Sequence, residues 1–268
     1  MPLLLCRKQA KQPYFYEKLN LRIWSEQELC YLIVRYPLLT LDELPNTDLI
    51  RWIGRELLMP KLAERLLQAQ KAGESRENQL LLILQSCNYY DASEIAVYRQ
   101  RVMELRRYSR SDYLREEAAA LFEAGRMNLA RDSFLRATDA LDEAERKEKN
   151  QDLREALMRK KANLYLDMAV VSMRLFEEQR ALNEIAASEL FAKTKRATRM
   201  RFLITGTGSL PDAEQDALQK RRRDAEETAK KSAAYRALVS VFDTDSVRRK
   251  AETAARIAVW KKEYRRML

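Results

Sequence analysis

Residues 111–137 read SDYLREEAAALFEAGRMNLARDSFLRA, and this stretch decides the fold. Apolar residues recur at helical spacing on both sides of a glycine: Leu114, Ala118 and Leu121 before Gly125, then Ala130, Phe134 and Ala137 after it. Spacings of three and four residues place side chains on one face of a helix. Glycine enters the left-handed conformation of a sharp turn without strain. The stretch therefore predicts two helices that pack against each other across a turn at Gly125.

The order of small and large residues in this stretch resembles one tetratricopeptide repeat, a helix-turn-helix unit of about 34 residues. In that family small residues lie where the two helices cross, and an aromatic residue fills the space between neighbouring repeats. The sequence departs from the family pattern at Leu114, which holds the first aromatic position, and at Asp142, which holds the closing proline position. The resemblance covers about residues 111–200 and implies a helical-repeat-like body that binds another protein.

A second copy of the pattern follows at an offset of 51 residues, from Ala130 to Ala181. Tyr165, Ala169, Ala181 and Ile185 hold equivalent positions, while Phe176 replaces the turn glycine and Ser188 the last alanine. Two interpretations remain open. Either a charged helical extension, residues 139–161, is inserted between two copies, or unrelated helical hairpins match by chance. Because such repeats need about three copies or substitute helices to bury their faces, we expect the flanking helices to cap the array.

The composition favours helices throughout the chain. The 268 residues include only 5 Gly and 6 Pro, while 46% are hydrophobic and 34% are charged. Average usage of about 7% Gly and 5% Pro would supply many more turn residues, so turns are few and elements are long. We predict an all-α fold, an irregular helical-repeat-like (TPR-like) array followed by a long C-terminal helical hairpin. Helix should include roughly 70% or more of the residues, against about 30–35% on average.

Composition and capping signals divide the chain into three predicted regions. Ser25 with Glu28, and Asp91 with Glu94, form capping boxes that begin helices. Residues 21–24 alternate as a short extended strand would. The predicted regions are an N-terminal helical module at residues 1–90, the repeat-like body at 91–205 and a basic, alanine-rich helical hairpin at 206–268.

The chain has no histidine, which excludes most common catalytic sites. Without imidazole it has no Ser-His-Asp or Cys-His pair, no His-ligated zinc and no imidazole proton shuttle. Adjacent carboxylates such as Glu116 and Glu117 diverge by about 100° on a helix, so they share neither a proton nor a metal. We expect them on the solvated surface. We predict a non-enzymatic protein without a catalytic residue, metal site or cofactor.

Cysteine usage and apolar runs bear on the compartment. Cys6, Cys30 and Cys87 form no C-x-x-C pair and leave an odd thiol if any two bridge, which fits a reducing cytoplasm. Residues 1–6, MPLLLC, lack a positive segment and a small residue before the cysteine, so we expect no signal peptide. The longest apolar runs have five residues or fewer, against about 18 for a membrane span. The sequence predicts a cytoplasmic protein without a membrane partner.

All of the excess positive charge lies near the C-terminus. Residues 193–268 carry 20 Lys and Arg and 10 Asp and Glu, whereas residues 1–192 carry 30 of each. This asymmetry indicates contact with nucleic acid or an acidic protein surface, or a solvated long helix. The candidate phosphate contacts are Lys220, Arg221, Arg222, Arg223, Lys230 and Lys231. Because acidic residues interleave with them, nucleic-acid binding is the alternative function rather than the leading one.

A bulky apolar stripe, Ile257, Trp260 and Tyr264, lies close to the end of the chain. It docks either on the body of this chain, on a partner or on another subunit. Since buried aromatic anchors tend to carry interface energy, these three residues are the candidate partner contacts. The leading functional hypothesis is a non-enzymatic, cytoplasmic scaffold or adaptor that binds another protein through a helix-lined surface.

Overall fold

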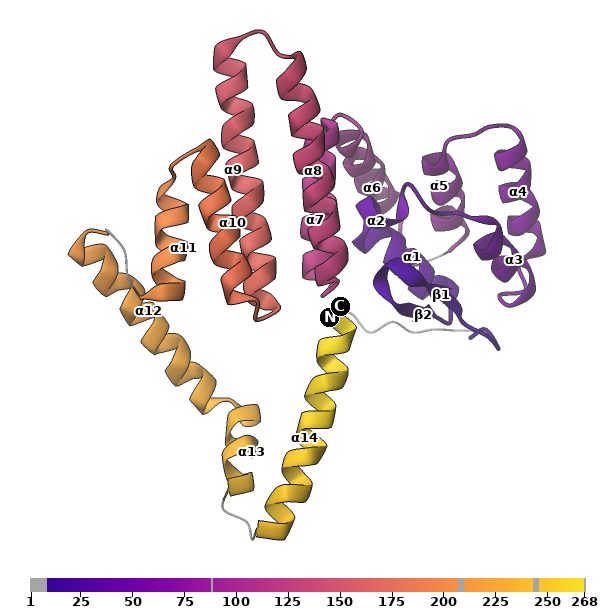
Figure 1. Ribbon diagram of the computed structural model, residues 1–268. Helices are drawn as coiled ribbons and strands as arrows, with labels where there is room; N and C mark the ends of the chain where they lie inside the picture. Colours follow the sequence, from indigo (N-terminus) through magenta and orange to yellow (C-terminus); the bar gives the residue numbers. More distant parts are fainter. Residues whose placement is uncertain (1–8, 88, 207–209, 243–245, 268) are drawn as a thin grey trace. The chain divides into compact units, whose positions relative to one another are not determined.

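The structure is a computed structural model that describes residues 9–87, 89–206, 210–242 and 246–267, and it confirms the all-α class (Figure 1). Helices account for 79% of the described residues and comprise fourteen α-helices and one short 3-10 helix. Within the same residues, strand is confined to β1 (Tyr14–Tyr16) and β2 (Leu21–Ile23). The helix content agrees with the scarcity of Gly and Pro, the two residues least favourable in a helix interior.

The chain divides into two compact units, Met1–Ala140 and Leu141–Leu268. Helix α8 (Met127–Lys147) runs across this division. The boundaries predicted after residues 90 and 205 follow composition rather than packing, and they remain predictions.

The first unit begins with the antiparallel hairpin of β1 and β2, whose register pairs Tyr14 with Ile23. The short strand predicted at residues 21–24 is therefore confirmed. A 3-10 helix, η1 (Glu17–Leu19), connects the strands and ends at Asn20, which has a left-handed φ of 53°. The helices that precede α8 are α1 (Glu26–Arg35), α2 (Pro37–Thr40), α3 (Thr47–Arg55), α4 (Pro60–Lys71), α5 (Arg76–Ser86), α6 (Ala92–Leu105) and α7 (Arg110–Glu123).

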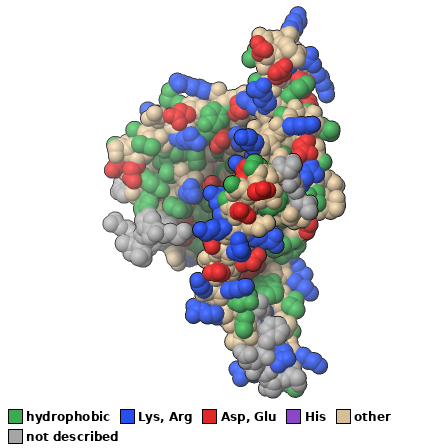
Figure 2. Space-filling view, turned by 90° about the vertical axis from the view of Figure 1, so that its left-hand side faces the viewer, with side chains coloured by type: hydrophobic (Ala, Val, Ile, Leu, Met, Phe, Trp, Pro, Cys, Tyr) green, Lys and Arg blue, Asp and Glu red, His purple; other side chains and the backbone are tan. Residues whose placement is uncertain are grey.

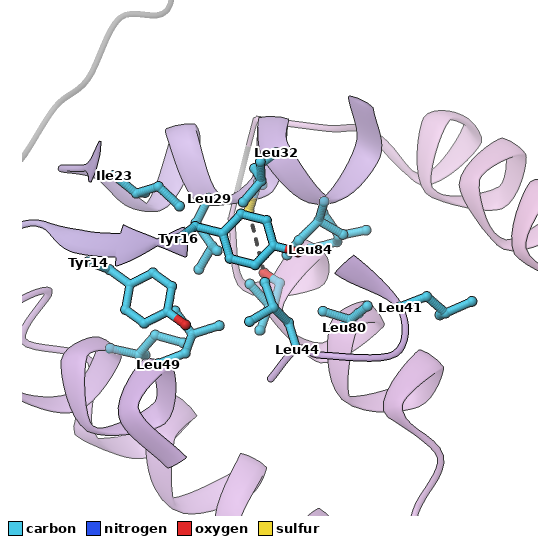
Figure 3. Close-up of a cluster of buried hydrophobic side chains, with 14 of the residues drawn as sticks. Tyr14, Tyr16, Ile23, Leu29, Leu32, Leu41, Leu44, Leu49, Leu80 and Leu84 are labelled. Atoms are coloured by element: carbon cyan, nitrogen blue, oxygen red, sulfur yellow. Dashed lines mark hydrogen bonds between the residues drawn. The ribbon is translucent and has the colours of Figure 1, made fainter. Parts of the chain in front are cut away.

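Leucine side chains from these helices pack against the tyrosines of β1 to form the core of the first unit (Figure 3). Tyr16 is 3% exposed, and two acceptors, the backbone carbonyl of Leu39 and Glu43 Oε2, lie within hydrogen-bond distance of its one hydroxyl proton donor. Leu80 and Leu84, from the apolar run in α5, are fully buried. The N-terminal strand and the helices thus share one hydrophobic core.

Polar side chains cap the helices much as the sequence predicts. Asp91 Oδ1 accepts from the backbone N–H of Glu94 at 2.8 Å, and Glu94 Oε2 accepts from the N–H of Asp91 at 3.0 Å. That capping box is complete. Ser25 Oγ accepts from the Glu28 N–H at 3.2 Å, while the Glu28 carboxylate reaches back to the N–H of Trp24, one residue before the cap.

The second unit contains one closely packed pair of helices, α9 and α10. The helices after this pair pack against one another less extensively. Helices α9 and α10 lie side by side (Figure 1), and residues from α9, α10 and α11 form a small core. That core comprises Leu166, Ala169, Ala181, Ile185 and Ala197. Beyond the end of α8, the helices of this unit are α9 (Gln151–Arg174), α10 (Glu178–Phe191), α11 (Lys195–Thr205), α12 (Asp212–Lys231), α13 (Ala233–Phe242) and α14 (Ser246–Met267).

The turns of the α7–α8 and α9–α10 hairpins have the same backbone geometry. Gly125 and Phe176 stand at equivalent places and have left-handed φ angles of 77° and 61°. In each turn the following residue donates its N–H to the carbonyl five positions earlier, at 2.8 Å and 2.9 Å. The small residues at equivalent positions, Ala118, Ala130, Ala169 and Ala181, are 0% exposed. The two hairpins are therefore alike locally, while the tetratricopeptide family remains a prediction.

Candidate protein-docking site

The three residues of the C-terminal stripe line a pocket in the second unit, with a volume of about 730 Å³. Phe176, from the turn between α9 and α10, lines the same pocket. The full lining consists of Phe176, Ile257, Trp260, Lys261, Glu263, Tyr264, Arg265 and Met267. This volume falls within the range of about 300–1,000 Å³ typical of binding pockets. We call it the C-terminal pocket.

The spacing of the stripe explains how α14 presents it. Ile257, Trp260 and Tyr264 are three, four and seven residues apart, so a rotation of about 100° per residue puts them within an arc of about 60°. Ile257 is 41% exposed and Trp260 is 51% exposed. Contiguous exposed apolar side chains with polar neighbours are typical of interaction sites.

The sequence did not identify Phe176 or Met267 as candidate contacts, and of the two Phe176 comes from outside α14. Its side chain is 83% exposed, although its backbone has a left-handed φ of 61°. That conformation costs a residue with a Cβ roughly 1–2 kcal/mol, and such strain concentrates at functional sites. The sequence identified Phe176 only as a replacement for the turn glycine. One feature of the sequence could have indicated its role: a bulky apolar residue stands at a turn position where the left-handed backbone favours glycine.

The electrostatics of α14 are strongly basic. The helix contains eight Lys and Arg residues and two Glu residues. All three charged residues Lys261, Glu263 and Arg265 are part of the pocket lining; at about 100° per residue Lys261 and Arg265 lie on one side of the apolar stripe and Glu263 on the other. Elsewhere on the helix Arg248 Nε pairs with Glu252 Oε1 at 2.8 Å, and Arg256 Nη2 donates to the carbonyl of Ala237 in α13 at 2.6 Å. The pocket therefore combines an apolar lining with a positive edge.

The residues of the alternative nucleic-acid hypothesis lie on α12, and the structure leaves all six exposed. Arg221, Arg222 and Arg223 are consecutive, so their side chains point about 100° apart rather than along one face. The helix carries six basic and six acidic residues, and ion pairs link Arg222 to Glu226 at 3.2 Å and Lys231 to Glu227 at 3.7 Å. In Figure 2, blue Lys and Arg side chains and red Asp and Glu side chains lie next to one another over the upper and middle parts of the face shown. Helix α12 thus has no net positive charge for a phosphate backbone.

The first unit holds a polar pocket of about 790 Å³ around Glu117. Glu117 is 6% exposed, so the expectation that it lies on the solvated surface was wrong. Its carboxylate accepts from Lys18 Nζ at 2.8 Å, from Ser133 Oγ at 3.1 Å and from Arg136 Nη2 at 3.1 Å. Glu117 is buried because it pairs with Lys18 from η1 and Arg136 from α8. The prediction considered the geometry of α7 only, so it did not include these two partners.

The carboxylates of Glu117 and Glu43 form a charged cluster with Lys18 and hold its ammonium group in the charged form. Lys18 Nζ lies 2.8 Å from Glu117 Oε1 and 2.9 Å from Glu43 Oε1. Burial by itself lowers the pKa of Lys18, but hydrogen bonds and attraction from both carboxylates outweigh it and raise that pKa above its ordinary value. Because these charged groups neutralise one another, we interpret the cluster as a structural link between η1 and the α7–α8 hairpin.

Comparison with known proteins gave no match: no family model, no curated protein and no solved structure is significantly similar to this chain. Among the helices that the structure describes, none is both long and apolar enough to cross a bilayer. No group of three or more Cys, Asp or Glu among the described residues is placed to hold a metal ion.

Proposed function

We propose that this protein is a non-enzymatic adaptor that holds a protein partner at the C-terminal pocket. One observation carries the proposal. None of the side chains described in α12, α13 and α14 is buried, yet three bulky apolar residues of α14 gather around one pocket with Phe176. A partner seated there would cover apolar surface that the described chain leaves in water.

The energetics favour a partner. In proteins most of the stability of a helix comes from packing of its apolar face, and none of the side chains described in α12 and α14 is buried. Burying an exposed Ile or aromatic side chain contributes roughly 1.5–3 kcal/mol before the costs of association. Trp and Tyr, together with Arg, are the residues that most often dominate interface energies. The pocket contains all three types, at Trp260, Tyr264 and Arg265.

The repeat-like hairpins support the same class of function. Stacked helix pairs bind proteins through shape and polar contacts and need no catalytic group. The shared turn geometry at Gly125 and Phe176 is consistent with the tetratricopeptide resemblance. We also propose a cytoplasmic location, because three widely spaced cysteines suit a reducing environment.

Site-specific photocrosslinking tests the proposal. The full chain would carry p-benzoylphenylalanine in place of Trp260, and a matched variant would carry it in place of Ala255, which is also exposed on α14 but lies about 140° away around the helix. We expect position 260, and not position 255, to crosslink to a protein in native lysate, with or without nuclease.

Two outcomes contradict the adaptor function. Equal crosslinking at positions 255 and 260 would show that contact is not specific to the pocket. Products that contain nucleic acid and vanish with nuclease would instead favour the nucleic-acid alternative, with α14 rather than α12 as the basic element.

A further inference from the structure

We infer that the C-terminal pocket accepts an amphipathic helix of a partner protein that carries acidic residues beside its apolar face. The inference rests on the proposed function and names the chemistry of the partner. Its basis is the juxtaposition of an apolar lining, formed by Phe176, Trp260 and their neighbours, with the basic residues Lys261 and Arg265, which outnumber the one acidic lining residue, Glu263.

The charge of α14 selects against a basic or self-paired occupant. With eight basic and two acidic residues, the helix attracts acidic groups and repels a second copy of itself. Arg and Lys at the pocket edge could pair with carboxylates of a partner, Arg265 in a bidentate manner. Contacts of this kind align the partner and accelerate association, while the aromatic lining provides the buried area.

The length of the stripe matches a helix. From Ile257 to Met267 the lining spans ten residue steps, or about 15 Å along α14. A partner helix presents apolar residues at i, i+3, i+4 and i+7 over about 10.5 Å, which fits within that length, and this is the pattern by which helices fill hydrophobic grooves. Two or three bulky side chains of such a helix could enter the pocket together.

The shape of the site argues against a lipid surface as the occupant. An amphipathic helix that binds a membrane presents a convex apolar face to the bilayer. Here Phe176, from a different element, lines the pocket together with residues of α14. A partner side chain that enters the pocket meets residues of both elements, whereas a flat layer of acyl chains does not enter it.

Two labelled peptides test the inference on the full chain. Both would be 18-residue helical peptides with the same Leu and Phe face, and the positions beside that face would be Glu in one and Lys in the other. In fluorescence anisotropy at 0.1 M salt, we expect the Glu peptide to bind at least tenfold more tightly than the Lys peptide. The preference should shrink in 0.5 M salt, because ions screen charges at the pocket edge.

Three variants locate the binding. Trp260→Ala should weaken the Glu peptide by about tenfold or more. The double change Lys261→Glu and Arg265→Glu should reverse the preference between the two peptides. The matched control, Lys220→Glu with Arg221→Glu, makes the same charge change on α12 and should leave that preference intact. Circular dichroism of each variant should show unchanged helix content.

Several results would overturn the inference. They are equal affinity for both peptides, indifference of the Glu peptide to Trp260→Ala, or tighter binding to phosphatidylserine vesicles or to a single-stranded oligonucleotide than to the Glu peptide. Formation of a stable dimer through the pocket in sedimentation would also overturn it. If a protein crosslinks at position 260 while the two peptides bind equally, the adaptor function stands and the acidic partner is excluded.

Discussion

Replacing Glu117 by Gln is expected to destabilise the first unit severely. Glutamine keeps nearly the same volume but removes the charge that accepts three hydrogen bonds, from Lys18, Ser133 and Arg136. The side chain of Glu117 is 8% exposed and that of Lys18 is 16% exposed, so water replaces the lost contacts poorly. The substitution therefore leaves a nearly buried ammonium group facing a neutral amide.

The expected loss in unfolding free energy is about 2–3 kcal/mol. Breaking a fully buried ion pair costs roughly 3–5 kcal/mol. Two features reduce the figure here. Lys18 keeps Glu43 as a partner at 2.9 Å, and the side chain of Arg136 is 57% exposed and regains water. The matched control is Glu123→Gln on the same helix, whose side chain is 68% exposed and pairs with Arg35 at 3.9 Å, and it should cost no more than about 0.5 kcal/mol.

Urea unfolding followed by tryptophan fluorescence measures this difference. Trp24 and Trp52 lie in the first unit, and Trp52 is 7% exposed, so its emission should change on unfolding. The midpoint for Glu117→Gln should fall well below those of the parent and of Glu123→Gln, with the slope unchanged. If Glu117→Gln and Glu123→Gln shift the midpoint equally, the ion pairs of Glu117 do not hold η1 on the α7–α8 hairpin.

Three further outcomes are expected. Ala130→Leu should overpack a fully buried helix crossing and cost about 1–3 kcal/mol, whereas Ala144→Leu on the exposed part of α8 should change the melting temperature little. Gly125→Ala should cost about 1–2 kcal/mol, because the left-handed φ of 77° strains a residue with a Cβ. The alanine Cβ would meet no other atom within 4 Å, so no steric clash adds to this cost. An unchanged melting temperature would refute that turn geometry. Burial and the charge of Glu43 raise the pKa of Tyr16 far above its unfolded value of about 10, so its contribution to stability is complete below about pH 10 and falls as the pH rises further. Urea midpoints at pH 8 and pH 11 should show this fall, and Tyr16→Phe should make it smaller.

Local signals in the sequence were sufficient for the fold class and for several details. Helical periodicity, few Gly and Pro, the Asp91 capping box and the turn at Gly125 each involve residues within a few positions of one another. Such interactions are the same wherever the segment lies in the fold, so a sequence pattern predicts them. The spacing that places Ile257, Trp260 and Tyr264 on one side of a helix is local in the same sense.

The contacts between distant segments came only from the tertiary structure. Glu117 is buried because Lys18, 99 positions earlier, meets it from η1, and no spacing rule relates the two residues. Phe176 and Trp260 line one pocket although 84 positions separate them. Helix geometry aligns the residues of a single helix, but packing decides which other element meets that face. The sequence by itself therefore determined the helices and the stripe on α14, while tertiary packing decided that Phe176 lines the same pocket and that the charged side chain of Glu117 is buried in the first unit.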